Sequence, residues 1–332
     1  MPFEILRNDI TNMRVDAIIN TANPKPEIGA GTDSAIHKKA GPQLLQARRE
    51  VGDISVGSAA VTPAFGLNAR YVIHTVGPVW RGGMCGEAVL LRQCYDRALA
   101  LAAENGCESV AFPLISTGNY GFPRDQALQI AISAFSNFLT EQELQIYLVV
   151  YDGDSFRLSE KLFRNVASYI DENYVEVRKK TSFATSRRLQ STELMECCAP
   201  SPCPPMAPKA ASLEDMLKLE DAGFTETLLR LIDQTGKKDS QIYKKANLSK
   251  QHFSKIRNNP NYKPTKPTAI ALALALELNL EATRDLIGRA GYALTNSSKF
   301  DLIIRYFIEQ GNYNVVEINV ALYEFDQVLL GA

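Results

Sequence analysis

The chain lacks any long apolar run. Its longest unbroken aliphatic stretch, Ala269–Leu276, is far shorter than the roughly 20 residues that a bilayer-spanning helix needs. The first residues, MPFEILRND, contain no cationic segment followed by an apolar core, so no secretory signal is predicted. With no signal to an oxidising compartment, we expect the six cysteines to be reduced thiols of a cytoplasmic protein.

Net charge and histidine are also scarce. The 332 residues carry 36 Lys and Arg against 37 Asp and Glu, a balance that excludes a uniformly basic nucleic-acid binder and a highly acidic disordered chain. Only three histidines are present, and no cysteine–histidine cluster has zinc spacing. We therefore predict no metal site and no cofactor, and we interpret His37 and His74 as structural residues.

Short β-branched segments alternate with helical patterns from Phe3 to about Val177. The expected strands are 16–21, 70–75, 109–115 and 145–151, and the expected helices are 87–104, 124–139 and 155–174. Apolar strands of this kind are usually covered on both faces, so the alternation favours a layered α/β domain with a largely parallel sheet.

The remaining chain changes character twice. Residues 178–212 are rich in Ser, Thr and Pro and poor in aliphatics, which predicts a flexible linker. Cys197, Cys198 and Cys203 lie in it and are expected to be solvated thiols. Residues 213–332 show helical patterns throughout, with a single strand candidate at 313–318.

Two glycine-bearing loops each follow an expected strand and lead into a helix. They are NTANPKPEIGAGTD, from Asn20 to Asp33, and STGNYGFP, from Ser116 to Pro123. Glycine turns let backbone N–H groups approach an anion, and a helix N-terminus adds its positive dipole end. Together the loops predict a diphosphate site, whereas each loop alone is more typical of a tight strand–helix connection. No Gly-Lys-Ser/Thr follows, which argues against a P-loop NTPase.

Several separated motifs in residues 1–177 resemble those of macro domains. NDIT at 8–11 is similar to the family's opening GDIT, NTAN at 20–23 to its NAAN, and YVIHTVGP and FPLISTGNYGFP to further signatures. The resemblance is to the MacroD-like branch, which binds ADP-ribose and removes it from esters. It implies a three-layer α/β/α fold with a mixed, largely parallel sheet.

The resemblance also implies roles for individual residues. Asp9 would recognise the adenine amino group, Tyr151 would lie against the adenine ring, and Asn23 would lie beside the distal ribose. The residues expected to bind ADP-ribose are Asp9, Ile10, Asn23, Gly29, Ala30, Gly31, Ser116, Thr117, Gly118, Asn119, Tyr120, Gly121, Phe122 and Tyr151.

Asn23 and Asp33 are the expected catalytic residues. Loss of an acyl group from the ribose needs an ordered water, which Asp33 would orient or deprotonate while Asn23 fixes the ribose hydroxyls. Asp33 is equally suited to cap the following helix. The loop also departs from the family's GGGGVD, because it has fewer glycines and carries Pro24 and Pro26. These changes stiffen the loop and leave open whether bound ADP-ribose is turned over.

Residues 239–280 resemble a helix-turn-helix of the Cro/repressor (XRE-like) type. Helical patterns at 240–246 and 250–257 flank Asn247, which suits a left-handed turn, and Ser249, which suits an N-cap. The expected apolar contacts are Tyr243, Leu248, Phe253 and Ile256.

Lys250, Gln251, His252 and Lys255 would project from the second helix toward a DNA major groove. Residues 237–266 hold nine Lys and Arg against one Asp. The same features are typical of a solvated basic face or of a protein-docking module that has lost DNA contact.

Three functions remain open on the sequence. The chain is an ADP-ribosyl ester hydrolase acting on modified Asp or Glu side chains or on O-acetyl-ADP-ribose, a non-catalytic ADP-ribose reader, or a transcriptional regulator that senses an ADP-ribose metabolite. The expected partners are ADP-ribose or an ADP-ribosylated protein, with DNA or a protein at the helical part, and no membrane.

Overall fold

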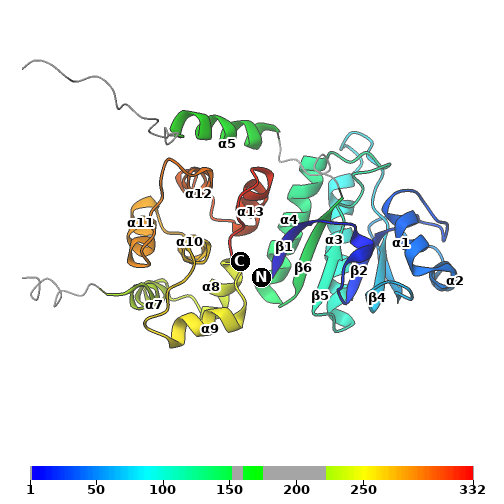
Figure 1. The fold of residues 1–332 in the computed structure, drawn as a ribbon. Helices are drawn as coiled ribbons and strands as arrows, with labels where there is room; N and C mark the ends of the chain where they lie inside the picture. Colours follow the sequence, from blue (N-terminus) through cyan, green and yellow to red (C-terminus); the bar gives the residue numbers. More distant parts are fainter. Residues whose placement is uncertain (1, 152–159, 175–221, 332) are drawn as a thin grey trace, which may run out of the picture.

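The computed structural model describes residues 2–151, 160–174 and 222–331. A sheet covered by helices on both faces is followed by a group of helices (Figure 1). The linker predicted at 178–212, with its three cysteines, lies outside the described residues. No described helix is long and apolar enough to cross a membrane.

The six-stranded sheet has the order β1-β6-β5-β2-β4-β3. All neighbouring strands are parallel except β3, which runs antiparallel to β4, so the predicted mixed, mostly parallel sheet is confirmed. The strands are β1 (Phe3–Arg7), β2 (Ala17–Thr21), β3 (Ala59–Pro63), β4 (Tyr71–Thr75), β5 (Ser109–Phe112) and β6 (Gln145–Val150). The two edge strands, β1 and β3, have no counterpart among the predicted strands, because partly covered edges lack a continuous apolar run.

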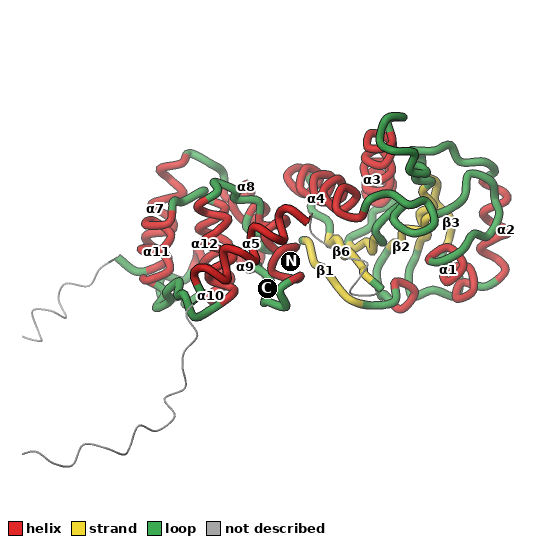
Figure 2. The backbone as a smooth tube through the Cα atoms, turned by 90° about the horizontal axis from the view of Figure 1, so that it is seen from above, coloured by secondary structure: helices red, strands yellow, loops and turns green. Residues whose placement is uncertain are grey.

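Side chains of the central strands alternate between two hydrophobic layers. In β2, Ile19 packs with the layer under α3 and α4, and Ile18 packs with the layer under α1. Viewed from above, α1 lies on one side of the sheet and α3 and α4 on the other (Figure 2). The helices of this half are η1 (Ile10–Asn12), α1 (Thr32–Ala40), α2 (Pro42–Val51), α3 (Glu87–Glu104) and α4 (Arg124–Glu141).

The second half is helical over residues 222–331. Its helices are α7 (Phe224–Thr235), α8 (Asp239–Lys245), α9 (Lys250–Asn258), α10 (Lys266–Ala275), α11 (Leu280–Arg289), α12 (Lys299–Glu309) and α13 (Val315–Glu324). Every residue of 268–275 in α10 is buried, as expected of a helix that is apolar all round.

The strand candidate at 313–318 is wrong. Asn314 is the N-cap of α13, and its side-chain oxygen accepts the backbone N–H groups of Val316 and Glu317. Val315, Val316 and Ile318 are all buried on this helix. Tertiary burial and a side-chain cap outweigh the strand propensity of these β-branched residues.

Helix α5 (Glu160–Asn173) packs against the helical half, not against the sheet (Figures 1 and 2). The Tyr169 ring lies 5.4 Å from that of Tyr306 in α12, and its hydroxyl donates to Glu309 over 2.8 Å. The Phe163 ring stacks on Phe325, at the end of α13. In the sequence, α5 continues the α/β alternation of the N-terminal half. In the structure, it contacts α12 and α13.

The two halves are joined through the edge strand β1. Asn247, in the turn between α8 and α9, accepts the backbone N–H of Phe3 over 2.9 Å and donates to the Phe3 carbonyl over 3.0 Å. The Asn247 side chain thus satisfies both polar groups of an edge residue, as a neighbouring strand would. Tyr243 adds a hydrogen bond to Glu143, and the buried residues of both halves form one continuous cluster.

Replacing Asn247 with Gly should destabilise the protein. Glycine tolerates the backbone φ of 56°, so the substitution removes only the side-chain hydrogen bonds and leaves the polar groups of Phe3 buried and unpaired. We expect the free energy of unfolding to fall by about 2–4 kcal/mol, since each buried unpaired group costs about 1–3 kcal/mol. Urea titration followed by the fluorescence of Trp80, the only tryptophan, measures this change in the N-terminal half.

Asp326→Gly is the matched control. Asp326 has a similar φ of 53° but is exposed, so its replacement should be neutral or slightly stabilising. Equal losses in the two variants would contradict the role assigned to the Asn247 side chain.

Candidate functional site

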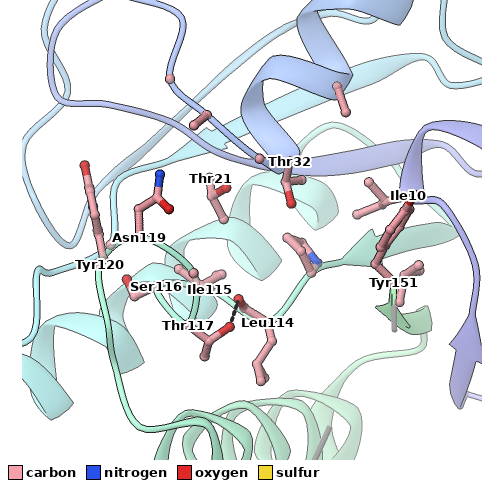
Figure 3. A pocket seen from close by; sticks show the side chains of 18 of the residues that line it. Ile10, Thr21, Thr32, Leu114, Ile115, Ser116, Thr117, Asn119, Tyr120 and Tyr151 are labelled. Carbon is pink, nitrogen blue, oxygen red and sulfur yellow. Dashed lines mark hydrogen bonds between the residues drawn. The ribbon is translucent and has the colours of Figure 1, made fainter. Parts of the chain in front are cut away.

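The two predicted loops meet at one edge of the sheet. Because β1, β2, β5 and β6 are parallel, their carboxyl ends lie together, and a cavity of about 570 Å³ opens there. Residues of both loops line it, with Tyr120 and Asn119 toward one end and Ile10 and Tyr151 toward the other (Figure 3).

The first loop ends at an uncapped helix. Gly31 is the N-cap of α1 at φ 68° and ψ −129°, a conformation that requires glycine, and no side chain caps the helix. The helix starts at Thr32, which lines the cavity. The backbone N–H groups of its first turn and its positive dipole end are therefore available to an anion in the cavity.

The second loop is closed by its own backbone. Ser116 has φ 65°, and its carbonyl accepts the N–H of Phe122 over 3.0 Å. A non-glycine residue in this region stores roughly 1–3 kcal/mol of strain, which is found mainly at ligand sites. The loop leads into α4, whose N-cap Pro123 also makes no side-chain cap. A second helix N-terminus thus begins at the cavity, where Arg124 contributes to the wall.

The opposite end of the cavity is more open. Asp9 caps the short helix η1 by accepting the N–H of Thr11 over 2.9 Å, and Ile10 follows it, largely buried. Tyr151, directly after β6, is 77% exposed. An apolar side chain, an exposed ring and a carboxylate therefore surround this end, a set that suits a planar heteroaromatic base with an amino group.

A buried polar network lies behind the first loop. Asn20 Nδ2 donates to Asp33 Oδ1 over 2.6 Å and lies 3.0 Å from His74 Nδ1. The other ring nitrogen of His74 lies 2.9 Å from Thr62 Oγ1. Burial first, and then the charges of Arg48 and His37, lower the pKa of His74 to about 3, so this ring is neutral and fixed.

Two buried side chains, Arg48 and His37, hold the same loop from two sides. Arg48 is buried and donates to the carbonyls of Asn23 and Pro24 over 3.2 and 3.1 Å. The His37 ring lies 3.5 Å from Asp33 Oδ1, while burial lowers the pKa of His37 and Asp33 opposes that shift. Both ends of the loop are therefore anchored to buried groups, in agreement with the stiffness expected from its prolines.

Asp33 and Asn23 converge beside Gly29. Asp33 Oδ2 accepts the Gly29 N–H over 2.5 Å, and a Cβ added to Gly29 would lie 3.3 Å from Asp33 Oδ2 and 3.0 Å from Asn23 Nδ2. The Tyr120 hydroxyl donates to Asn23 Oδ1 over 3.2 Å. Burial raises the pKa of Tyr120, with the charge of Asp33 adding to the shift, so the hydroxyl keeps its proton.

The expectation that Asp33 caps α1 is wrong. Gly31 holds the N-cap position, and the Asp33 carboxylate turns back to Asn20 and to Gly29. Asp33 is only 2% exposed and does not line the cavity itself. Its carboxylate lies behind Gly29, which has no side chain to separate it from Asn23.

The cavity wall contains all the residues predicted to bind ADP-ribose except Gly121 and Phe122. Phe122 is buried against Trp80, with ring centroids 4.7 Å apart, and Gly121 turns the loop at φ 65°. The sequence patterns missed Asn20 and Arg48, which hold the loop without entering the cavity. Asn20 had a recognisable signal, because it is a polar residue inside an otherwise apolar strand.

Within residues 2–151, 160–174 and 222–331, no group of three His, Cys, Asp or Glu side chains is placed to hold a metal ion. His37 and His74 both belong to the polar network behind the first loop.

Helices α8 and α9 form a short helical pair in the second half. Asn247 has the left-handed conformation predicted for it, and Ser249 accepts the N–H of His252 as an N-cap. Lys250, Gln251 and Lys255 are exposed on α9, whereas the His252 ring lies 3.0 Å from the Tyr262 hydroxyl and is half-buried. The predicted apolar contacts are all buried: Tyr243, Leu248, Phe253 and Ile256.

The fold defines an α/β domain with a cavity at the carboxyl edge of its sheet. The macro domain family matches residues 19–131. An O-acetyl-ADP-ribose deacetylase of Citrobacter rodentium is 49% identical over 164 residues, which are 48% of this chain and 93% of that protein. The enzyme of the same name from Salmonella typhi is 48% identical over 165 residues, 48% of this chain and 92% of that protein.

A Trypanosoma brucei macrodomain, solved in complex with ADP-ribose, is 36% identical with a TM-score of 0.44, covering 46% of this chain and 66% of that one. The chain belongs to the macro domain family, and its N-terminal half is related to O-acetyl-ADP-ribose deacetylases. The family match does not reach residues 222–331, where the helix-turn-helix interpretation stays a prediction.

The neutral state of His74 predicts a specific pH dependence of stability. The folded pKa of about 3 lies below the ordinary value of 6.5, so the unfolded chain binds the extra proton between these values and stability falls as the pH is lowered through this range. Between pH 7 and pH 5 wild type should lose about 2 kcal/mol more than His74→Gln in free energy of unfolding. Urea titrations at both pH values measure this difference.

His252→Gln serves as the control, because His252 is only half-buried and hydrogen-bonded in the helical half. It should keep most of the wild-type pH dependence. If His74→Gln were as acid-sensitive as wild type, a buried neutral His74 would be contradicted.

Proposed function

We propose that the cavity binds ADP-ribose and that the N-terminal half hydrolyses an ester on the distal ribose, either of an ADP-ribosylated Asp or Glu side chain or of O-acetyl-ADP-ribose. The observation that carries this proposal is the convergence of Asn23 and Asp33 beside Gly29, at a cavity flanked by two uncapped helix N-termini. The names of the related deacetylases support it.

The ligand would lie along the cavity. Its diphosphate carries about two negative charges and would lie between Gly29–Gly31 and Ser116–Tyr120, where α1 and α4 begin. The adenine would lie at the end formed by Asp9, Ile10 and Tyr151. This orientation brings the distal ribose to the end of the cavity where Tyr120 lies (Figure 3) and to Asn23, which accepts the Tyr120 hydroxyl.

The reaction is ester hydrolysis. The oxygen of a water molecule forms a bond to the acyl carbon, the bond from that carbon to the ribose oxygen breaks, and the ribose hydroxyl regains a proton. Asn23, oriented by Tyr120, would bind the ribose hydroxyls, and the Asp33 carboxylate would orient and polarise the water beside Gly29. Backbone N–H groups at the two helix starts would stabilise the negative charge of the diphosphate.

Wild-type protein should release ADP-ribose from O-acetyl-ADP-ribose, and three variants should lower kcat. Asn23→Ala removes the ribose contact, Asp33→Asn removes the carboxylate, and Gly29→Ala places a methyl group between the two side chains. We expect at least about a hundredfold loss for Asp33→Asn, a typical contribution of a positioned acid–base group. Product release measured by chromatography gives the rate.

Calorimetric binding of ADP-ribose is the control for folding of each variant. Binding by wild type with no release from any ester would contradict the hydrolase and leave the reader function. Full activity of Asp33→Asn would contradict only the proposed role of the carboxylate in orienting the water, not the hydrolase function.

A second function is proposed for the helical half on one observation, the exposed face of α9. Lys250, Gln251 and Lys255 lie on it, and the preceding turn is fixed by Asn247. Four of the nine cations in 237–266 are paired with carboxylates: Lys237 and Lys245 with Glu277, Arg257 with Asp239, and Lys266 with Asp301. A fifth, Lys244, donates to the Thr140 carbonyl. Within the described residues, no acidic partner is present for the other four, Lys238, Lys250, Lys255 and Lys263. We propose that this face binds duplex DNA.

DNA binding through α9 should depend steeply on salt. About four phosphate contacts give a slope near −3.6 for log affinity against log salt. A double variant that carries Lys250→Gln and Lys255→Gln should have a slope that is less negative by about 2. Fluorescence anisotropy with random duplex DNA measures both. Lys299→Gln, an exposed lysine on α12, should leave the slope unchanged. Undetectable binding at low salt would favour a protein-docking module, and an affinity that changes with ADP-ribose would favour the regulator.

A further inference from the structure

The loop Trp80–Gly86, between β4 and α3, is held in place although most of it faces solvent. Residues 81–86 are exposed, and Met84 is 92% exposed. Gly82, Gly83 and Gly86 have positive φ values of 99°, 85° and 76°, so the conformation of this rim loop depends on glycine. Such a loop is expected to be mobile unless another group fixes it.

Glu87 is that group. Glu87 as a residue is 2% exposed, and its carboxylate accepts three backbone N–H groups, those of Arg81, Gly83 and Cys85, over 3.0, 3.2 and 2.7 Å. Backbone N–H groups, its own at the start of α3 first, hold the pKa of Glu87 below its ordinary value. The protein buries a charge to order an exposed loop, which keeps Met84 in a defined position.

The rim loop is connected to the cavity by a short chain of contacts. The Trp80 N–H donates to the Tyr120 carbonyl over 2.8 Å, and the Tyr120 hydroxyl donates to Asn23. The Trp80 ring packs on Phe122, and Gly83 lies over the same ring, where a Cβ would approach it to 2.8 Å. The loop therefore contacts the backbone of Tyr120, a residue of the cavity wall at the end where the proposed ester would lie, opposite Tyr151.

We infer that the rim loop is the docking surface for the polypeptide that carries the ester-linked ADP-ribose. The inference rests on the proposed function, because it takes the distal ribose to lie at Asn23 and Tyr120. The group attached to that ribose leaves the cavity beside Tyr120 and next meets the loop that binds the Tyr120 backbone. An acetyl group ends before it reaches the loop, whereas a polypeptide continues across it.

The loop has the chemistry that such a chain needs. Met84 presents a flexible apolar side chain that adapts to different neighbours, and Val79, 49% exposed, precedes the loop. Arg81 is exposed on the same loop and attracts acidic residues next to a modified Asp or Glu. The rim loop thus makes ester-linked protein a better substrate than O-acetyl-ADP-ribose.

The test compares two substrates of the full-length protein. One is O-acetyl-ADP-ribose, and the other is a synthetic peptide with ADP-ribose esterified to a glutamate between acidic residues. Met84→Asp should raise KM for the peptide by about tenfold, as expected when an apolar anchor is lost, and leave kcat and the kinetics of O-acetyl-ADP-ribose within twofold of wild type. Met84→Leu should restore the wild-type KM.

Val328→Asp, at an exposed apolar position in the helical half, is the control and should change the kinetics of neither substrate. An unchanged peptide KM in Met84→Asp, or an equal loss on both substrates, would overturn the inference. If wild type hydrolysed neither substrate, the proposed function would fail, and calorimetry of the modified peptide against free ADP-ribose would decide the docking question. In that case, equal affinities of wild type for the modified peptide and for free ADP-ribose would overturn the docking surface. Tighter binding of the modified peptide, weakened by Met84→Asp, would support it.

Discussion

The geometry of the cavity depends on one buried carboxylate. Asp33 is tied to the sheet through Asn20 and to the first loop through the Gly29 N–H, so a single charged group fixes the loop relative to the strand from which it departs. A buried charge is tolerated only when several donors satisfy it, and here an amide, a backbone N–H and a nearby imidazole do so. The same arrangement aligns Asn23 with Gly29, which makes the structural and the proposed catalytic roles of Asp33 inseparable.

Two other buried charged side chains fix loops in the same way at the borders of the site. Arg48 holds the carbonyls at the start of the first loop, and Glu87 holds the N–H groups of the rim loop. In each case a charged side chain forms hydrogen bonds with backbone groups of a loop, and these groups have no partner in a neighbouring strand. The loops around the cavity are therefore preorganised, which reduces the entropy that a ligand would have to remove on binding.

The helical half contributes to the same framework through β1. Asn247 pairs with Phe3 at the start of this strand, and the strand continues to Asn8 and Asp9 in the cavity wall. An edge strand with one unpaired side would be exposed to water and to other chains, and here α13 and the turn between α8 and α9 cover it. The residue that forms the left-handed turn between two helices thus also completes the sheet.

Much of the fold follows from local patterns. The apolar runs at β2, β4, β5 and β6 predict buried parallel strands, and the position of both glycine loops after strands predicts that they meet at one edge. Half of the residues that line the cavity come from these loops, and most of the others lie at the carboxyl ends of the parallel strands, so pattern and topology suffice to locate it. The edge strands β1 and β3 escape prediction because only half of each is covered, and α13 escapes because burial and a cap overrule β-branched propensity.

The sequence by itself therefore determined the layered α/β architecture, the two loops and the turn at Asn247, since these depend on neighbours along the chain. Only the tertiary structure decided that Asp33 lies behind Gly29 and does not cap α1, that α5 joins the helical half, and that Asn247 completes the sheet. Each of these outcomes is a contact between distant segments. Burial selects such contacts by satisfying polar groups in three dimensions, and no local pattern encodes that requirement.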